Sequence, residues 1–371
     1  SSVPAPELGA VVIRELIKSS RVKASQISEV IMGNVLSAGL GQAAARQSAI
    51  KAGLPNFVEC LTINKMCGSG LKAVMLADQV IRSGDADVVI AGGMESMSNA
   101  PYLLPNARDG QRLGHGKMID SMIHDGLWDA YNDTHMGNCA EMLSKERNYM
   151  REAQDEFAVT SYKRAQKAQA EGVFDSEIVS VEIPQRKGNP IKVSEDEEPG
   201  KARFDKIPTL GPAFEKNGAI TAANASKLND GAAAVLIMSA EKANELGLSP
   251  TARIIAQASA AHEPEWFTTA PGKAIGKVLE KANLSANDID LWEINEAFSA
   301  VTMAAIDDFK IDPAKVNIYG GAVAMGHPIG ASGARIFTTL LNGMTRTDAK
   351  YGLATLCIGG GEASALIVEK V

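Results

Sequence analysis

The sequence predicts a duplicated α/β layered fold with mostly parallel strands, interrupted by a large inserted loop domain. Three observations support this prediction. Similar segments recur in the same order about 265 residues apart, strand-like and helical segments alternate in each half, and a more polar stretch breaks the repeat. A fixed offset marks a duplicated unit, and strand–helix alternation is typical of layered α/β folds.

Three pairs of segments carry the repeat. Residues 86–96 and 351–364 each predict a buried strand that ends in a glycine turn, and 5–12 resemble 270–277. Helices are expected from Gly68 to about Ile81 and from Ala331 to about Asn342. In the second half, we expect strands at 253–259, 290–294 and 316–322, and helices at 271–282, 298–309 and from Ser332.

The repeat also predicts the domain organisation. Residues 97–229 have no counterpart in the second half, so we expect an inserted loop domain there. The N-terminal half then comprises 1–96 with 230–249, and the C-terminal half comprises 250–371. Because the second half opens with a strand and the first half opens with a helix, we expect that the first β-strand of the N-terminal half is missing.

The composition excludes several classes of protein. The 371 residues are 45% hydrophobic and 22% charged, which predicts an ordered protein of two domains or more. A net charge of −7 without a basic stripe argues against nucleic acid as a partner. No apolar run reaches membrane-spanning length. Four cysteines without a CxxC pair are typical of free thiols in a reducing compartment.

Cys67 is the first candidate for chemistry. It follows a strand-like segment and precedes Gly68, Ser69 and Gly70, where a helix begins. A thiol at a helix N-terminus feels the positive end of the helix dipole, which favours the thiolate. The alternative is a small buried residue in a tight turn.

Three further residues occupy comparable turns. His327 lies in a glycine-rich strand-to-helix turn, at the counterpart of the Cys67 turn, and could act as a general base or be a structural histidine. Cys357 ends a strand before three glycines, whose N–H groups suit an oxyanion. Asn295 follows a strand and either holds a water or caps a helix.

These segments together resemble the thiolase family over essentially the whole chain. The motifs are MCGSG at 66–70, NEAF at 295–298, GHP at 326–328 and CIG at 357–359, in that order. The resemblance implies a layered α/β/α/β/α fold. Within the family, the chain is most similar to short-chain acetoacetyl-CoA thiolases (acetyl-CoA acetyltransferases) of the mitochondrial type.

The resemblance also implies roles for individual residues. The catalytic set comprises Cys67, His327, Cys357, Asn295 and Gly359. Tyr131 and Asn132 match the region of the acyl pocket. The residues expected to bind substrate or coenzyme A are Leu127, His135, Met136, Phe214, Ala223, Ser226, Ala297 and Phe298. A potassium ion is expected at Tyr162, Ala222, Ala223, Ala225 and Val323, mostly through backbone carbonyls. No covalently bound cofactor is expected.

The implied reaction is the reversible condensation of two acetyl-CoA molecules to acetoacetyl-CoA and coenzyme A, through an acetyl group on Cys67. Two alternatives stay open: a longer-chain 3-ketoacyl-CoA thiolase, and a non-catalytic acyl-CoA-binding protein on the same scaffold. The resemblance further implies a homotetramer in the mitochondrial matrix, with the cytoplasm as the alternative compartment. Cys60, Cys139, His115, His124 and His262 are assigned to structure, and His135 with Cys139 lacks the further ligands of a metal site.

Overall fold

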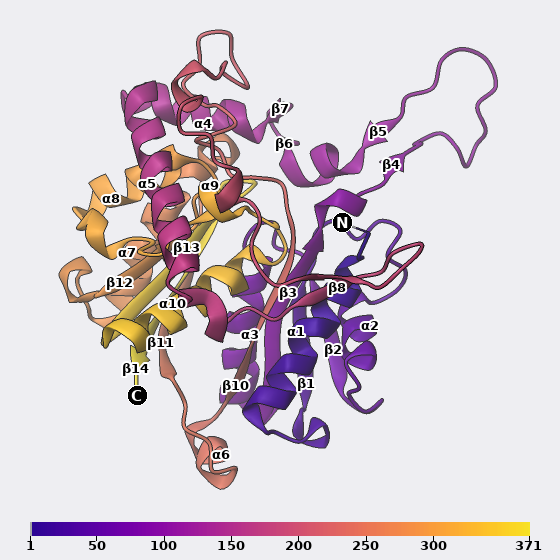
Figure 1. Cartoon of the computed structure of the whole chain (residues 1–371), viewed down its shortest axis with the longest axis vertical. Helices are drawn as coiled ribbons and strands as arrows, with labels where there is room; N and C mark the ends of the chain where they lie inside the picture. Colours follow the sequence, from indigo (N-terminus) through magenta and orange to yellow (C-terminus); the bar gives the residue numbers. More distant parts are fainter. Residues whose placement is uncertain (1) are drawn as a thin grey trace.

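The computed structural model describes residues 2–371 and contains two four-stranded sheets with helices between and outside them (Figure 1). The first sheet has the order β10-β3-β1-β2, with β1 at Glu29–Gly33, β2 at Glu59–Ile63, β3 at Val88–Ser96 and β10 at Asp230–Met238. The second has the order β11-β14-β13-β12, with β11 at Ala252–Ala261, β12 at Leu291–Ile294, β13 at Tyr351–Ile358 and β14 at Glu362–Lys370. The neighbours of β1 are parallel to it, whereas β10 and β14 pair antiparallel.

Helices complete five layers. α1 (Ala5–Ser20) and α2 (Ala44–Lys51) cover the outer face of the first sheet, and α7 (Ala270–Ala282) with α8 (Ser299–Phe309) covers the outer face of the second. α3 (Ser69–Ser83) and α10 (Ser332–Thr347) lie between the sheets. The predicted α/β/α/β/α order is therefore confirmed.

The central strands β1 and β3 of the first sheet are largely apolar on both faces because both faces are covered. Val30 of β1 packs in the core beneath α1 and α2, whereas its neighbour Ile31 packs in the core around α3. Successive side chains of a strand point to opposite faces, so a strand between two helical layers needs a continuous apolar run. Burial of both strand faces therefore explains the uninterrupted hydrophobic segments of the sequence.

The central layer shows the duplication most directly. Gly70 of α3 and Gly333 of α10 are counterparts in the sequence repeat, and each packs against the other helix. A Cβ on Gly70 would lie 2.6 Å from the nitrogen of Ala334, and one on Gly333 would lie 2.3 Å from the nitrogen of Leu71. The two helices therefore approach through glycine on both sides.

One predicted strand is wrong. Residues 316–322 form a single bridge, between Val316 and Trp292, and then turn. Asn317 ends the pairing because it has a left-handed backbone (φ 46°) and its side chain takes the place of a strand. Its amide accepts the N–H of Ile294 at 2.9 Å and donates to the carbonyl of Ile294 at 2.8 Å. A short helix, α9 (Ala322–Met325), follows instead.

Residues 97–229 contribute no described strand to either large sheet. They form α4 (Met136–Glu146), α5 (Arg151–Ala170) and three two-stranded ribbons, β4–β5 (Tyr102–Leu103, Ile119–Asp120), β6–β7 (Trp128–Asp129, Thr134–His135) and β8–β9 (Val181–Ile183, Ile191–Val193). The chain between β4 and β5 projects as a long arm (Figure 1). The short helix α6 (Ala240–Glu245) lies in the segment that links the two halves. The domain boundaries stay predictions.

Two further points concern the chain as a whole. Across residues 2–371, no helix is both long and apolar enough to cross a membrane. The predicted missing first strand concerns chain outside the described residues, and it stays a prediction.

Candidate active site

Cys67 lies in a tight turn between β2 and α3. Met66 before it has a left-handed backbone (φ 45°), which is uncommon for a residue other than glycine and marks local strain. The side chain of Ser69 holds this turn, because its hydroxyl accepts the N–H of Lys65 at 2.9 Å and donates to the carbonyl of Met66 at 2.6 Å. The turn places the thiol at the N-terminus of α3, as predicted.

The thiol of Cys67 is neutral in the resting structure, contrary to the expectation from the helix dipole. Burial raises the pKa of Cys67 to about 11, although hydrogen bonds from the N–H groups of Gly359 and of Cys67 itself lower it. The cost of removing a thiolate from water therefore outweighs the favourable dipole. The same two N–H groups converge on the sulfur, which is the arrangement of an oxyanion site.

Cys357 lies near Cys67, at the end of β13. Its side chain is 1% exposed, and burial together with the charge of Cys67 raises the pKa of Cys357 well above its ordinary value. The chain then turns through Gly360 and Gly361, both with left-handed backbones (φ 91° and 82°). This turn brings the N–H of Gly359 to the thiol of Cys67, so the two cysteines lie near each other.

His327 follows α9 rather than a strand, so its predicted strand-to-helix turn is wrong in that detail. Its N–H donates to the carbonyl of Lys227 at 3.0 Å and to the side chain of Asn229 at 3.2 Å. Burial, reinforced by the positive charge of Arg335, lowers the pKa of His327 to about 3. The imidazole is therefore neutral at physiological pH and can accept a proton.

The hydroxyl of Ser332 contacts the ring of His327. Its Oγ lies 2.5 Å from Nδ1 of His327 and 2.9 Å from the carbonyl of Pro328. When the hydroxyl proton is directed at Pro328, Oγ is the acceptor for the imidazole, and Nδ1 carries the proton and donates to Oγ. Nε2 then has a free lone pair and is the basic nitrogen. From the sequence, Ser332 was predicted only as the start of a helix.

Asn295 faces the same imidazole. Its Nδ2 lies 3.5 Å from both ring nitrogens of His327, and its buried Oδ1 has no hydrogen-bond partner among the described residues. The alternative of a helix cap does not hold, because the N-cap of α8 is Phe298. A buried amide oxygen without a partner is a site for a water or a ligand atom.

Glu95 joins the half that carries Cys67 to the half that carries His327. Its carboxylate accepts N–H groups from Val35 at 3.0 Å, Leu36 at 3.1 Å and Gly330 at 2.9 Å. Burial raises the pKa of Glu95 to about 7. It was missed in the sequence analysis, although a carboxyl group at the end of the buried strand 88–96 was a visible signal.

The residues expected to contact coenzyme A lie around one apolar cluster. His135 stacks on Phe214 with ring centroids 4.8 Å apart, and Phe214 meets Phe298 edge-on at 6.2 Å. The cluster also contains Met136, Ala297 and Cys357. The N–H of Ser226 donates to the carbonyl of Ala297 at 3.0 Å, and Ala223 is buried in the same loop. Leu127 ends a π-helical turn, Met122–Leu127, and Tyr131 lies beside Gly360.

The potassium ligands expected from the resemblance surround a lysine. The ammonium of Lys227 donates to the carbonyl of Ala222 and, at 3.4 Å, to that of Ala225. It also lies 5.5 Å from the ring centroid of Tyr162, which packs in one cluster with Val323. Two of the expected carbonyl ligands thus already accept hydrogen bonds from a fixed cation. The residues present therefore do not fit an additional potassium ion.

The other cysteines and histidines have structural surroundings. Cys139 is fully buried in the cluster that contains Cys357, and Nδ1 of His135 accepts the N–H of Gly137 at 3.0 Å to cap α4. His262 joins the turn at Gly361 through its backbone N–H, at 2.8 Å. Cys60 is half-buried, and His115 and His124 are exposed.

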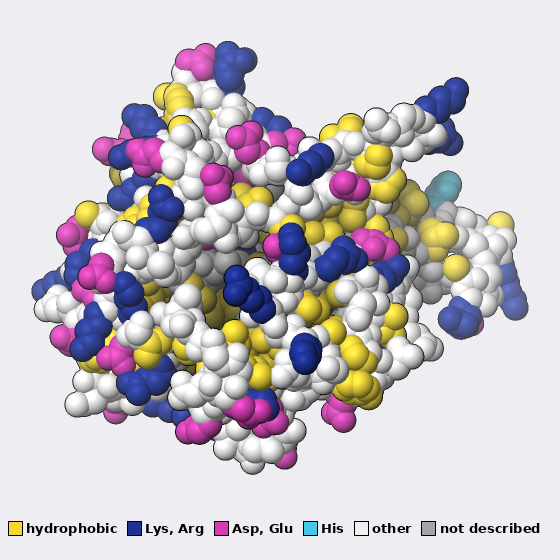
Figure 2. Space-filling view, turned by 60° about the horizontal axis from the view of Figure 1, so that its bottom comes forward, with side chains coloured by type: hydrophobic (Ala, Val, Ile, Leu, Met, Phe, Trp, Pro, Cys, Tyr) yellow, Lys and Arg dark blue, Asp and Glu magenta, His cyan; other side chains and the backbone are white. Residues whose placement is uncertain are grey.

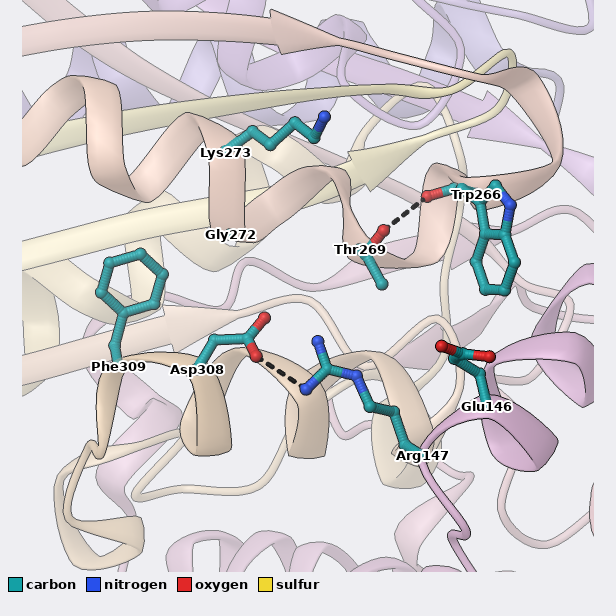
Figure 3. A pocket seen from close by; sticks show the side chains of 8 residues that line it. All are labelled: Glu146, Arg147, Trp266, Thr269, Gly272, Lys273, Asp308 and Phe309. Carbon is teal, nitrogen blue, oxygen red and sulfur yellow. Dashed lines mark hydrogen bonds and ion pairs between the residues drawn. The ribbon is translucent and has the colours of Figure 1, made fainter.

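A shallow pocket of about 550 Å³ lies away from these residues, at the far ends of α4 and α8 (Figure 3). The ion pair between Arg147 and Asp308, at 2.8 Å, closes one side of it, and Lys273 and Glu146 lie on its rim. None of the predicted catalytic or substrate-binding residues lines it.

Comparisons with known proteins identify the family and the fold of the chain. Residues 1–241 match the family described as Thiolase, N-terminal domain, and 248–370 match Thiolase, C-terminal domain. An acetyl-CoA acetyltransferase of Cupriavidus necator is 56% identical and one of Schizosaccharomyces pombe is 50% identical, each over 100% of this chain and 94% of the relative. The crystal structure of Acat5 thiolase from Ascaris suum in complex with coenzyme A has a TM-score of 0.95 at 44% identity, over 100% of this chain and 94% of that chain.

Proposed function

The chain belongs to the thiolase family, and we propose that it is an acetyl-CoA acetyltransferase. It interconverts two acetyl-CoA molecules with acetoacetyl-CoA and coenzyme A through an acetyl group on Cys67. One observation carries the proposal: the turn that bears Cys67 packs against the end of β13 that bears Cys357, because a Cβ on Gly68 would lie 2.3 Å from the side chain of Ile358. The N–H groups of Cys67 and Gly359 lie at the first sulfur. The names of the relatives support the acetyl substrate.

The first half-reaction transfers the acetyl group to Cys67. Nε2 of His327 accepts the thiol proton, and the sulfur attacks the thioester carbon of acetyl-CoA. The N–H groups of Cys67 and Gly359 stabilise the oxyanion that forms, and removing one such donor typically costs about 10²–10³ in rate. The departing sulfur of coenzyme A takes the proton of Cys357, which leaves an acetyl-enzyme and a thiolate at Cys357.

The second half-reaction forms the carbon–carbon bond. The thiolate of Cys357 removes a proton from the methyl group of a second acetyl-CoA, and its raised pKa makes it a strong base for this step. The enolate oxygen is stabilised by His327 and by a water held on Asn295, whose Oδ1 has no other partner among the described residues. The enolate carbon attacks acetyl-Cys67, and the released Cys67 sulfur recovers its proton from His327.

The first alternative differs from the proposed function in the length of the acyl group that the enzyme accepts. A longer-chain 3-ketoacyl-CoA thiolase would use the same residues, so the test compares thiolysis of acetoacetyl-CoA with thiolysis of a long 3-ketoacyl-CoA. We expect a preference for acetoacetyl-CoA. A marked preference for the long substrate would overturn the acetyl assignment and leave the family intact.

The second alternative is a protein that binds acyl-CoA without turnover. The wild-type protein and the variants Cys67→Ser and Cys139→Ser are compared in the thiolysis assay. Cys139 is the control because it is another free cysteine, packs in an apolar cluster and has no role in the proposed reaction. We expect Cys67→Ser to lose turnover and Cys139→Ser to retain it. Binding of coenzyme A without turnover in the wild type would favour the binding protein.

Assembly and compartment belong to the same proposal. A homotetramer is supported by the projecting β4–β5 arm, where Leu104 and Leu113 are exposed, and by the edge strand β2, where Leu61 is exposed beside Phe57. Figure 2 shows hydrophobic side chains among Lys and Arg on this side of the molecule. Light scattering of the purified chain tests the tetramer. The mitochondrial matrix, with the cytoplasm as alternative, rests on the family resemblance, and cell fractionation tests it.

A further inference from the structure

The ammonium group of Lys227 occupies a cage of backbone carbonyls next to the catalytic residues. It donates to the carbonyls of Ala222 and Ala225 and lies over the ring of Tyr162. The side chain of Lys227 is half-buried and Tyr162 is buried, whereas Ala222 is exposed. The ammonium therefore lies at the boundary between the interior and solvent, with its bonds directed to the main chain of its own loop.

The backbone of the same residue holds the catalytic base. The carbonyl of Lys227 accepts the N–H of His327 at 3.0 Å, and the N–H of the preceding Ser226 donates to the carbonyl of Ala297 at 3.0 Å. A bridge between Ala225 and Phe298 continues this pairing. The ammonium of Lys227 bonds two carbonyls of its own segment, residues 222–227. It therefore fixes the segment whose backbone bonds His327 and Ala297. Its effect on His327 is therefore one of positioning.

A second cation does not fit beside the ammonium. A potassium ion would need several of the same oxygen atoms, and two like charges in one half-buried cage repel strongly. Lys227 brings its charge with the chain, so the cage is filled at any salt concentration. Glu198 is the acidic group whose charge favours the ammonium form, whereas burial lowers the pKa of Lys227 to about 8.

We propose that Lys227 is a tethered monovalent cation that replaces a potassium ion and orders residues 222–227 and His327. The enzyme would then be independent of potassium. The effect on turnover rests on the proposed function, whereas the effect on the loop does not.

The experiment compares two variants of the same lysine. Lys227→Ala removes the ammonium and opens its space, whereas Lys227→Met removes the charge but keeps most of the volume. Lys350→Ala is the matched control, because Lys350 also lies over a tyrosine ring, at 4.6 Å from the centroid of Tyr351, but is exposed and bonds no carbonyl cage. Thermal unfolding and thiolysis kinetics are measured in potassium chloride and in tetramethylammonium chloride at equal ionic strength.

We expect the wild type and Lys350→Ala to show the same melting temperature and the same kinetics in both salts. Lys227→Ala should have a higher melting temperature in potassium chloride than in tetramethylammonium chloride. In potassium chloride its KM for coenzyme A should also fall and its kcat should rise, each by about fivefold or more, which is the lower range of coupling between two sites. Lys227→Met should be impaired in both salts. Melting temperature does not require turnover, so a wrong activity assignment and a wrong cation assignment give different results.

Two results would overturn the proposal. One is a wild-type enzyme that potassium activates or stabilises relative to tetramethylammonium, which would mean that the cage still takes an ion. The other is a Lys227→Ala variant that folds and behaves identically in both salts. If that variant does not fold, the wild type decides: independence of potassium supports the proposal and activation by potassium refutes it.

Discussion

The role of Ser332 gives the sharpest prediction about the chemistry. Its Oγ lies 2.5 Å from Nδ1 of His327 and is also bonded to Pro328, so we expect the hydroxyl to accept the Nδ1 proton and to select the tautomer with a free Nε2. The substitution Ser332→Ala removes this acceptor and leaves a cavity of one atom. The imidazole then keeps its position through the backbone bonds of His327 to Lys227 and Asn229.

The expected size of the effect follows from the cost of a buried group without a partner. In Ser332→Ala, the Nδ1–H of His327 loses its acceptor in a site that is 6% exposed. That loss costs roughly 1–3 kcal/mol and favours the tautomer that carries its proton on Nε2, which cannot accept the proton of Cys67. Since about 1.4 kcal/mol corresponds to tenfold in rate, kcat/KM should fall by roughly tenfold to a hundredfold.

The assay is steady-state thiolysis of acetoacetyl-CoA, with ¹⁵N NMR of the histidine ring to observe the tautomer. Ser144→Ala is the control, because Ser144 is also a buried helical serine. Its hydroxyl donates to the carbonyl of Ala140 at 2.9 Å and accepts a hydrogen bond from the side chain of Gln154. Both variants should lose stability, and only Ser332→Ala should lose turnover and change the ring spectrum. Normal turnover of Ser332→Ala with an unchanged tautomer would refute the reasoning.

Three further predictions follow from the same structure. The lowered pKa of His327 means that the unfolded state binds its proton first, so the contribution of His327 to stability falls as pH drops below about 6.5. By pH 4.5 this contribution has fallen by about 3 kcal/mol, and it should appear in urea unfolding as the difference in pH dependence between the wild type and His327→Asn. Gly333→Ala should destabilise the protein by about 3 kcal/mol in the same assay because its Cβ would lie 2.3 Å from a backbone nitrogen, whereas Gly276→Ala, with its nearest atom at 4.0 Å, should be neutral or stabilising. Cys357→Ala should abolish exchange of the acetyl-CoA methyl protons with deuterated water while retaining slow acetylation of Cys67, and retained exchange would exclude Cys357 as the base.

The sequence repeat predicted much of the architecture, because each half must bury its own sheet. The counterpart glycines Gly70 and Gly333 are visible in the repeat, and their contact across the central layer explains why both are glycine. The absence of a strand at 316–322 could not be predicted from the apolar run of these residues. A single side chain, that of Asn317, satisfies the backbone of β12 and ends the pairing after one bridge.

The catalytic turns were predictable from their residue types, whereas their electrostatics were not. A helix N-terminus next to Cys67 favours a thiolate, but the depth of burial that raises its pKa depends on elements far away in the chain. Ser332 and Glu95 were not predicted as site residues for a related reason. The role of a serine or a glutamate becomes visible only when its hydrogen-bond partners are known. The lysine at position 227 likewise shows its meaning only once its ammonium is placed among the carbonyls.

The central claim is that Cys67 carries the acetyl group. The direct measurement is mass spectrometry of the protein after incubation with acetyl-CoA and quenching in acid, followed by peptide mapping. One acetyl group on the peptide that contains Cys67, removed again by added coenzyme A, is the predicted result. Acetylation confined to another cysteine, or none while acetoacetyl-CoA is formed, would contradict it.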